Sequence, residues 1–280
     1  MFIITKQIQN ITAAAFVAVF ITACTGTDEI EEREIIGSVE TLYNSGMNAM
    51  ESGAYIEAIQ TLQELERQHP YSGWATRAQM MITYAQYRRG EYDEAVAGVG
   101  RFLRMHPGHK DIPYMIYIKG LSYYERISDV KRDQGHTLEA LKTFKELTSR
   151  FPDNEYSKDA RLKITLCLDH LAGQEMMVGR YYQKEGRFLA AINRFRYVVE
   201  VYETSGQTAE ALYRLTESYL SLGIDDEAQA AAAVLGHNFP GSDWYADAYA
   251  LMKGQNLEPV AKEGSWLGNV FKGVKESLSD

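Results

Sequence analysis

The residues in this chain most capable of chemistry are its six histidines and its second cysteine, Cys167. Two histidines stand directly before a proline, and three later segments of similar pattern hold another planar ring at that position: His69, His106, Phe151, Tyr202 and Phe239. Because rings of different chemistry share the position, we interpret the two histidines as packing groups. The other four histidines lack the spacing of metal ligands.

No arrangement of the remaining polar residues predicts catalysis. The sequence has no nucleophile motif and no glycine-rich phosphate loop after a strand. Acidic clusters such as Asp225 to Glu227 stand at expected helix starts, where negative charge favours the helix dipole. An enzyme acting on peptidoglycan would need two carboxylates placed for acid–base work, and the pattern offers no such pair. We therefore expect no enzymatic activity, no metal and no cofactor, and a function that lies in binding surfaces.

The other cysteine, Cys24, follows an apolar run from Ile11 to Ala23 that has the length of a signal-peptide core. Residues 21–24, Ile-Thr-Ala-Cys, resemble the bacterial lipobox, whose cysteine becomes the acylated first residue of the mature protein. The resemblance implies a lipoprotein signal peptide over 1–23 and acyl chains such as palmitate on Cys24, which anchor the chain without crossing the membrane. Thr25, where an aspartate would favour inner-membrane retention, points to the periplasmic face of the outer membrane. An ordinary secretory signal with an incidental cysteine is the alternative.

An acylated Cys24 leaves Cys167 with no cysteine for an intramolecular disulfide. Cys167 lies on an apolar stripe of helical spacing with Ile164, Leu168 and Leu171, which predicts a small buried hydrophobic residue. Lys6 is the only charged residue of segment 1–23, so removal of that segment leaves 28 basic and 38 acidic residues, a net charge of −10 instead of −9. This acidic balance disfavours a nucleic-acid partner.

A repeated pattern extends over most of the chain. Five times a glycine is followed five residues later by an alanine: Gly53 and Ala58, Gly90 and Ala95, Gly135 and Ala140, Gly186 and Ala191, Gly223 and Ala228. A proline follows twelve residues after four of these alanines, and Glu203 takes its place in the fourth repeat. We expect the glycine to form a left-handed turn between two helices, the alanine to let them approach closely, and the proline to end the second helix.

The segments "GAYIEAIQTLQELERQHP" and "GEYDEAVAGVGRFLRMHP" resemble the second half of a tetratricopeptide repeat, a helix-turn-helix unit of about 34 residues. We expect an all-α solenoid of five such repeats over 38–253, ending in a capping helix from Ser242 to Lys253. The alanines are 37, 45, 51 and 37 residues apart, so the third repeat gains a loop near 128–134 and the fourth a longer first helix, about 157–185.

Segments on both sides of the solenoid have different compositions. Residues 24–37 are predicted to form an acidic tether. Residues 254–280 begin as a polar linker and continue as an amphipathic tail with apolar residues at helical spacing: Trp266, Leu267, Val270, Phe271, Val274 and Leu278. A helix this short is marginal alone, so it should dock on a partner, on the solenoid or, least readily, on the membrane.

In tetratricopeptide proteins the first helices of successive repeats line a groove. The resemblance implies that this groove displays tyrosines and arginines of repeats one to three, extended by two aromatic residues after Pro70: Tyr43, Arg77, Tyr84, Tyr87, Arg88, Tyr114 and Tyr117, with Tyr71 and Trp74. Tyrosine offers flat apolar area, and arginine binds a carboxylate bidentately. The surface would suit an extended aromatic peptide with a free C-terminus. The alternative, that several tyrosines only fill gaps between helices, stays open.

The lipobox, the five repeats and the runs "AQYRRGEYDEAVAGVGRFLRMHPGHKDIPYMIYIKGLSYY", "SRFPDNEYSKDAR" and "YYQKEGRFLAAINRF" together resemble the BamD family of outer-membrane assembly lipoproteins over about 38–253. Membership implies a scaffold subunit of the β-barrel assembly machinery. Its first repeats would bind C-terminal signals of unfolded outer-membrane proteins, and its later repeats, with Arg194 as a candidate, would bind a BamA-type barrel subunit beside the complex's other lipoproteins. A generic periplasmic adaptor for cell-wall or competence factors is the alternative.

Overall fold

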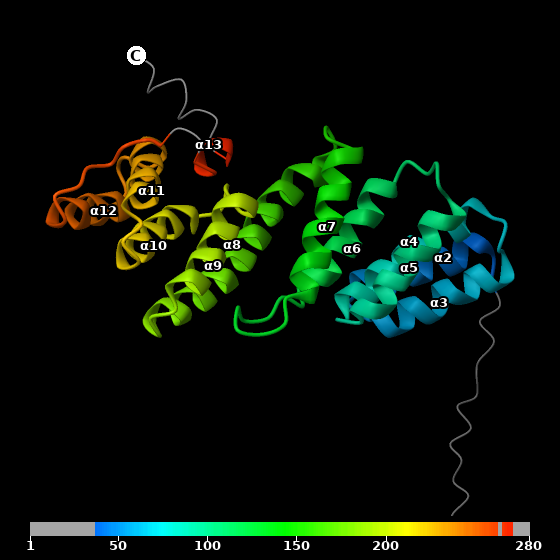
Figure 1. The fold of residues 1–280 in the computed structure, drawn as a ribbon. Helices are drawn as coiled ribbons and strands as arrows, with labels where there is room; N and C mark the ends of the chain where they lie inside the picture. The colour runs from blue at the N-terminus through cyan, green and yellow to red at the C-terminus, as the bar shows by residue number, and fades with distance from the viewer. Residues whose placement is uncertain (1–36, 263–264, 271–280) are drawn as a thin grey trace, which may run out of the picture. The chain divides into compact units, whose positions relative to one another are not determined.

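Every regular element in the described part of the chain, residues 37–262 and 265–270 of the computed structural model, is an α-helix (Figure 1). The first six are α2 (Val39–Glu51), α3 (Tyr55–Gln68), α4 (Gly73–Arg88), α5 (Tyr92–Met105), α6 (Ile112–Tyr124) and α7 (Gly135–Arg150). They are followed by α8 (Glu155–Lys184), α9 (Phe188–Val201), α10 (Thr208–Ser221), α11 (Asp225–Asn238), α12 (Asp243–Gly254) and α13 (Leu267–Val270). The predicted signal peptide, Cys24 and Phe271 onward in the tail lie outside the described residues.

The helices α2 to α11 form five consecutive pairs. Each helix packs against the next one in the chain, and the first helices of repeats one to four also contact one another in sequence. Helix α12 packs on both α10 and α11, where the first helix of a sixth repeat would lie. The predicted all-α solenoid of five tetratricopeptide repeats with a capping helix is therefore confirmed.

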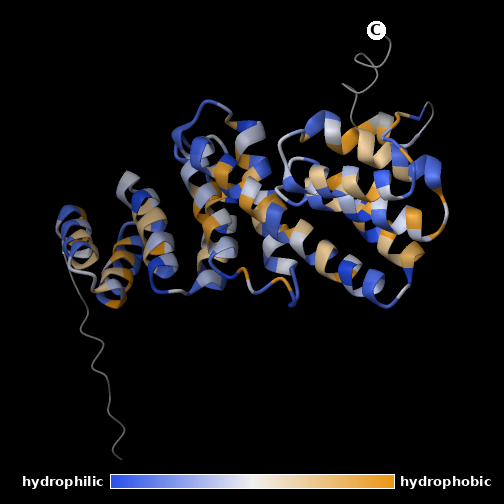
Figure 2. Cartoon of the chain, turned by 90° about the vertical axis from the view of Figure 1, so that its left-hand side faces the viewer, coloured by the Kyte–Doolittle hydropathy of each residue, from blue (hydrophilic) through white to orange (hydrophobic). Residues whose placement is uncertain are grey.

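The repeat positions chosen from the sequence form the core. All five repeat alanines, from Ala58 to Ala228, are fully buried. The apolar residues four and seven positions later, among them Phe102, Phe144 and Phe195, are at most 1% exposed. Hydrophobic residues accordingly concentrate where neighbouring helices face one another (Figure 2). Burying each large apolar side chain contributes roughly 1.5–3 kcal/mol, so these positions supply much of the packing energy.

Four of the five repeat glycines have the predicted left-handed conformation, with φ of 78° at Gly53, 77° at Gly90, 70° at Gly186 and 69° at Gly223. The prediction is wrong for Gly135. That residue is the first of α7, because the loop from Glu125 to Gln134 separates α6 from α7 and replaces the tight turn. Asp133 Oδ2 accepts a hydrogen bond from Gly135 N at 3.0 Å and helps to start the helix.

The second helix of each repeat ends at the ring position that precedes the proline. In all five repeats the backbone N–H of the ring residue donates to the carbonyl four residues earlier, over 2.8–2.9 Å. Helix α9 stops there without a proline, since Thr208 Oγ1 donates to the carbonyls of Tyr202 and Glu203 at 3.1 and 3.0 Å. The ring of His106 packs 5.0 Å from that of Phe102, which agrees with the packing interpretation of this histidine.

The loop before α7 and the 30-residue helix α8 form one structural feature. His170 Nε2 on α8 lies 2.7 Å from the carbonyl oxygen of Ser128 in the loop. Gln174 Nε2, one turn further along α8, donates to the carbonyl of Arg132 at 3.4 Å. The extra length of the fourth repeat thus supports the extra residues of the third, and His170 is explained by this contact.

Two glycines of α8 offer a test of helix packing. A Cβ added at Gly179 would collide with the buried Phe195 ring, whereas one at Gly173 would lie 3.6 Å from Val130 Cγ1, an ordinary contact. We expect Gly179→Ala to lower the free energy of unfolding by about 1–3 kcal/mol, as overpacking does. Gly173→Ala should leave it unchanged or raise it by up to about 1 kcal/mol through helix propensity. Urea denaturation of both variants measures the difference; equal shifts would contradict this account of the interface.

The buried Cys167 provides a second prediction. It is completely inaccessible to solvent, as its stripe predicts, and burial raises the pKa of its thiol to about 11. Since only the thiolate reacts, the folded chain should resist a thiol reagent at pH 8. In a Cys24→Ser variant, Cys167 is the sole thiol. We expect it to be labelled completely in denaturant, and to react in buffer at less than about a tenth of its rate in denaturant. Rapid stoichiometric labelling of the folded protein would disprove this packing.

Candidate peptide-binding surface

The predicted peptide-binding residues lie mainly on the first helices of repeats one to three. Tyr43 is on α2, five of the residues are on α4, and two are on α6: Trp74, Arg77, Tyr84, Tyr87 and Arg88, then Tyr114 and Tyr117. Because α2 contacts α4 and α4 contacts α6, the structure brings these helices together. Tyr71 lies in the turn before α4 and is fully exposed. Ser72 Oγ caps α4 by accepting from Ala75 N at 3.1 Å, which fixes the start of the helix.

Three of these residues form a cluster at the start of α4. The rings of Tyr43 and Trp74 lie 4.7 Å apart between centroids, and the Arg77 guanidinium carbon is 5.2 Å from the centre of the Trp74 ring. The aromatic face holds the guanidinium by a cation–π contact that leaves its N–H donors available for an anion. The structure therefore brings Tyr43, Trp74 and Arg77 side by side.

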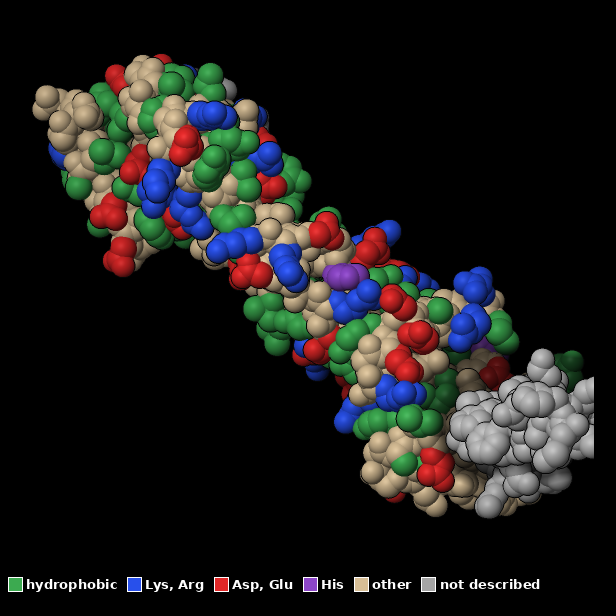
Figure 3. Space-filling view, turned by 90° about the horizontal axis from the view of Figure 1, so that it is seen from below, with side chains coloured by type: hydrophobic (Ala, Val, Ile, Leu, Met, Phe, Trp, Pro, Cys, Tyr) green, Lys and Arg blue, Asp and Glu red, His purple; other side chains and the backbone are tan. Residues whose placement is uncertain are grey.

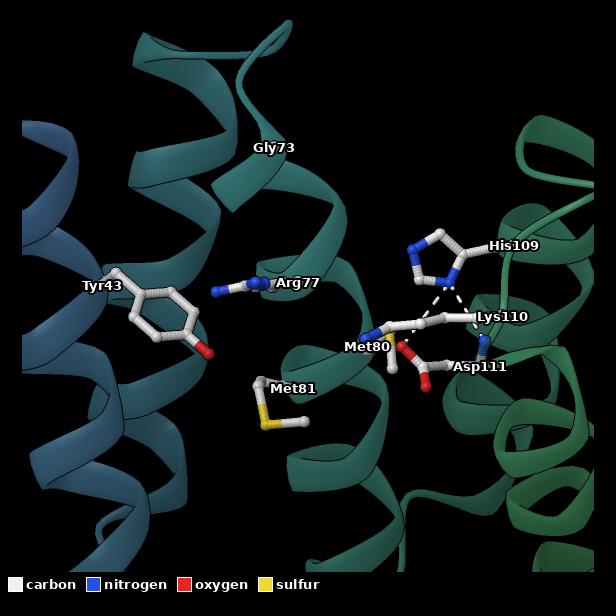
Figure 4. A pocket seen from close by; sticks show the side chains of 8 residues that line it. All are labelled: Tyr43, Gly73, Arg77, Met80, Met81, His109, Lys110 and Asp111. Carbon is white, nitrogen blue, oxygen red and sulfur yellow. Dashed lines mark hydrogen bonds and ion pairs between the residues drawn. The ribbon is translucent and has the colours of Figure 1, made fainter.

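This cluster borders an opening of about 480 Å³ between α2, α4 and the loop before α6 (Figure 4). The lining residues are Tyr43, Gly73, Arg77, Met80, Met81, His109, Lys110 and Asp111. The side chains of Arg77 and Lys110 both border this opening, next to the thioethers of two methionines. The opening combines positive charge with adaptable apolar surface.

The charges in this opening are not balanced. Two cations, Arg77 and Lys110, line it together with one carboxylate, that of Asp111. Asp111 N donates to His109 Nδ1 at 3.2 Å, and the same ring nitrogen lies 3.6 Å from the Asp111 carboxylate. Among the described residues, neither Arg77 nor Lys110 has an ion-pair partner. Two cations beside apolar surface suit a ligand that carries a carboxylate next to a large apolar group.

The residues at the end of α4 have partners within the fold. Arg88 Nη1 donates to the Tyr84 hydroxyl at 2.9 Å, and its guanidinium lies 5.3 Å from the centre of the Tyr55 ring. The Tyr87 hydroxyl donates to Glu125 Oε1 at 3.4 Å. Burial, together with Glu125, raises the pKa of Tyr87 to about 12, so this tyrosine stays neutral. These side chains provide a second aromatic cluster, with a guanidinium already held in place.

Of the four tyrosines of α6, the two predicted ones, Tyr114 and Tyr117, join this helix to α8. The Tyr117 hydroxyl donates to Asp159 Oδ2 at 2.5 Å, and its ring stacks on Tyr156 at 5.2 Å. Tyr114 lies 5.5 Å from the same Tyr156 ring. Burial is the largest cause that raises the pKa of Tyr114 and the pKa of Tyr117. These contacts show that both tyrosines fill gaps between helices. Their rings are only half-buried, so part of each ring remains on the side formed by the first helices.

Arg194, the predicted partner-binding residue, lies on α9 at the far end of the solenoid from Tyr43. Its side chain is 46% exposed and forms an ion pair with Glu175 on α8 at 3.0 Å. A shallow opening of about 290 Å³ beside it is lined by Tyr182, Ala190, Asn193, Arg194 and Tyr197. The structure therefore keeps Arg194 apart from the opening near Arg77.

Sequence reasoning missed His109, Lys110 and Asp111. They follow Pro107 as Ser72, Gly73 and Trp74 follow Pro70, so the repeat register itself places both triplets at the junction with the next first helix. The register that points to Tyr71 and Trp74 after Pro70 therefore also points to these three residues after Pro107.

The described residues include no metal-ligand cluster and no membrane-spanning helix. No group of three or more histidine, cysteine, aspartate or glutamate side chains there could hold a metal ion. No helix in 37–262 or 265–270 combines the length and apolar character needed to cross a bilayer. One face of the molecule shows lysine, arginine and acidic side chains interspersed, with hydrophobic groups between them (Figure 3). Because charges of both signs alternate on this face, it does not present a large patch of positive or of negative charge.

Known proteins resemble this chain over most of its length. A family model described as outer membrane lipoprotein (YfiO) matches residues 37–235. Outer membrane protein assembly factor BamD of Caulobacter vibrioides is 44% identical over 255 residues, covering 89% of this chain and 82% of the relative. The protein of the same name from Rickettsia prowazekii is 42% identical over 223 residues, covering 80% and 89%.

Solved structures include a thermophilic tetratricopeptide-repeat protein of Thermus thermophilus, with a TM-score of 0.37, 19% identity and coverage of 75% of this chain and 98% of that one. The family assignment itself rests on the sequence matches: the family model over residues 37–235 and two relatives at 44% and 42% identity over most of the chain. This chain belongs to the BamD family of outer membrane lipoproteins.

Proposed function

We propose that this protein is a lipid-anchored, non-enzymatic subunit of the β-barrel assembly machinery on the periplasmic face of the outer membrane. In this role it binds C-terminal signals of unfolded outer-membrane proteins and the BamA-type barrel subunit, together with the other lipoproteins of the complex. The names of its relatives support the assembly role. The lipobox at Cys24 supports the anchor.

The observation that carries the peptide-binding part is the pair of unpaired cations, Arg77 and Lys110, beside Met80 and Met81. A peptide that ends in an aromatic residue presents a carboxylate within one residue of a large apolar ring. Arg77 would bind that carboxylate bidentately, with Lys110 adding a second positive charge, while the ring packs on the thioethers and on Tyr43. The preceding peptide residues would continue along Tyr84, Tyr87 and the α6 tyrosines.

Arg194 supports the barrel-subunit part by its place in the repeat. The position three residues after the repeat alanine holds a small, buried residue in the other repeats: Thr61, Gly98, Thr143 and Ala231. In the fourth repeat an exposed arginine occupies it, so packing within the solenoid does not explain the residue. Arg194 is 46% exposed and pairs with Glu175 through one nitrogen, Nη1. The other N–H donors of the guanidinium remain available to a carboxylate of a partner.

The peptide site is tested with peptides that end in an aromatic residue. We expect Arg77→Gln to weaken binding of the free-acid peptide about tenfold or more, since one charge-assisted contact is worth roughly 1.5–3 kcal/mol. Tyr84→Ala should weaken it as well, through lost aromatic contact. Titration calorimetry with the free-acid and the C-terminally amidated peptide measures both effects.

The matched control is Arg104→Gln, which removes the same charge from an exposed position on α5. It should bind like the parent chain. Equal affinity of the parent chain for the acid and the amide, or full binding by Arg77→Gln, would remove the assignment of this opening.

The complex is tested by gentle solubilisation of outer membranes and purification through a tag on this protein. A large β-barrel with periplasmic repeats should co-purify in near-stoichiometric amount. Arg194→Glu should reduce that yield severalfold because it places repulsion at the proposed contact, and Lys184→Glu, at an exposed position at the end of α8, should not. Recovery of cell-wall or competence factors in place of the barrel would favour a generic adaptor.

A further inference from the structure

The outer face of the last repeat differs from that of the other four. Two residues after the repeat alanine, the second helix carries a side chain that is exposed in repeats one to four: Gln60, Ala97, Lys142 and Asn193. In repeat five the residue is Ala230, which is only 2% exposed. One turn further on, Val234 is 3% exposed, where the other repeats hold Glu64, Arg101, Glu146 and Tyr197. Another segment of the chain must therefore cover this face of α11.

The capping helix does not explain this burial. Helix α12 takes the place of a following first helix, and in repeats one to four a following first helix leaves the corresponding positions open. The additional contact of α11 is with α13. The chain therefore returns after α12 and places the described tail residues, 257–262 and 265–270, against the last two repeats. We call these residues the strap.

Polar contacts hold the first part of the strap on α11. Gln229 Nε2 donates to the carbonyl of Glu258 at 2.8 Å. Lys262 Nζ lies 2.9 Å from Glu227 Oε1, and Ser265 Oγ donates to the other oxygen of the same carboxylate at 3.2 Å. One carboxylate of α11 thus binds two strap residues, and α11 supplies an amide donor as well.

Apolar contacts hold the second part. Leu267 is 1% exposed and belongs to the core cluster that includes Ala230 and Val234, and Val270 packs against that cluster. The Arg196 guanidinium carbon of α9 lies 4.5 Å from the centre of the Trp266 ring. Leu267 is thus buried as deeply as the repeat core, although it lies outside the repeats.

We propose that α9 and α11 form a second peptide-binding site, formed by Arg196, Glu227, Gln229, Ala230 and Val234, and that its resident ligand is the chain's own strap. The recognised pattern is a lysine, a Trp-Leu pair four and five residues later, and an apolar residue three positions beyond: Lys262, Trp266, Leu267 and Val270. The site offers a carboxylate and an apolar face, so it selects a cation beside large apolar groups. The opening at Arg77 has the opposite charge and does not suit this ligand.

The covalent connection keeps the strap in place. A short linker gives a tethered ligand an effective concentration on the order of millimolar, so a separate peptide at micromolar concentration does not compete with it. The strap also lies on Arg196, two residues from the exposed Arg194. A macromolecule that binds the outer face of repeats four and five therefore meets the strap, and must either displace it or bind around it.

The test uses a fluorescent peptide of residues 256–270 and the full-length chain. In the double variant Trp266→Ala/Leu267→Ala the site is vacated, and the peptide should bind in fluorescence anisotropy, with hydrogen exchange of the α11 amides slowing on binding. The parent chain and the matched variant Val260→Ala, whose side chain is 55% exposed in the strap, should bind at least about tenfold more weakly. A peptide carrying the two alanines should not bind any of them.

Failure of the peptide to bind a folded double variant, as judged by circular dichroism, would overturn the proposal. Equal binding to all three chains would overturn it too. A second measurement needs no substitution: a zero-length carbodiimide should join Lys262 to Glu227 in the parent chain, as it should join Lys163 to Asp159, a pair 3.2 Å apart on α8. Mass spectrometry that finds the α8 link without the strap link would contradict a seated strap.

Discussion

The close approach of two helices at a small residue is the constraint on which the rest of this structure depends. In three repeats a glycine of the first helix faces a large apolar side chain of the second: Gly46 and Leu62, Gly120 and Phe144, Gly179 and Phe195. No Cβ fits there, because it would come within 2.7 Å of Leu62 or 2.5 Å of Phe144. In repeat two the arrangement is reversed, and a Cβ at Gly98 on α5 would come within 2.6 Å of Thr83 Oγ1 on α4. These contacts fix the rotation of the first helices, and so determine which of their residues pack and which remain exposed. The aromatic and cationic residues on α2, α4 and α6 share one side of the solenoid for this reason.

Departures from the repeat are informative because the repeat itself is so regular. The inserted loop and the long helix α8 compensate for each other, since His170 and Gln174 bind carbonyls of the loop. The fourth repeat ends its second helix at the usual position without a proline, and Thr208 binds the carbonyls of Tyr202 and Glu203 there as Ser157 binds that of Phe151 in the third. Arg194 is different in kind: it interrupts a series of small buried residues and is not buried itself. Packing explains a departure that the fold compensates, but it does not explain one whose side chain stays exposed.

The sequence predicts most of the fold because the periodic positions report packing directly. Glycine, alanine and the ring position locate the pairs of helices, the core and the capping helix. The same register fails at Gly135, since an insertion can move a turn without moving the following alanine. It does not place His109 to Asp111 around the same opening as Tyr43 either, because the two segments lie more than sixty residues apart in the chain. For the tail, the amphipathic pattern predicts docking on a partner, on the solenoid or on the membrane, and the small buried residues of α11 show that Leu267 docks on the solenoid.

Composition at equivalent positions explains why the two ends of the solenoid can bind different ligands. Near the first repeats, Arg77 and Lys110 line an opening that has a single carboxylate, that of Asp111, so it carries excess positive charge that a ligand carboxylate can balance. On the last repeat, Glu227 faces outward beside Ala230 and Val234, and the surface lacks a cation and an apolar cover, both of which the strap provides. In a solenoid each repeat contacts only its neighbours, so a substitution at one end does not disturb packing at the other. One chain can therefore carry excess positive charge at one end and an outward carboxylate at the other. An unpaired ion beside apolar surface favours a ligand of opposite charge and repels a ligand of the same charge. The sign of the unpaired charge therefore determines which ligand each end prefers.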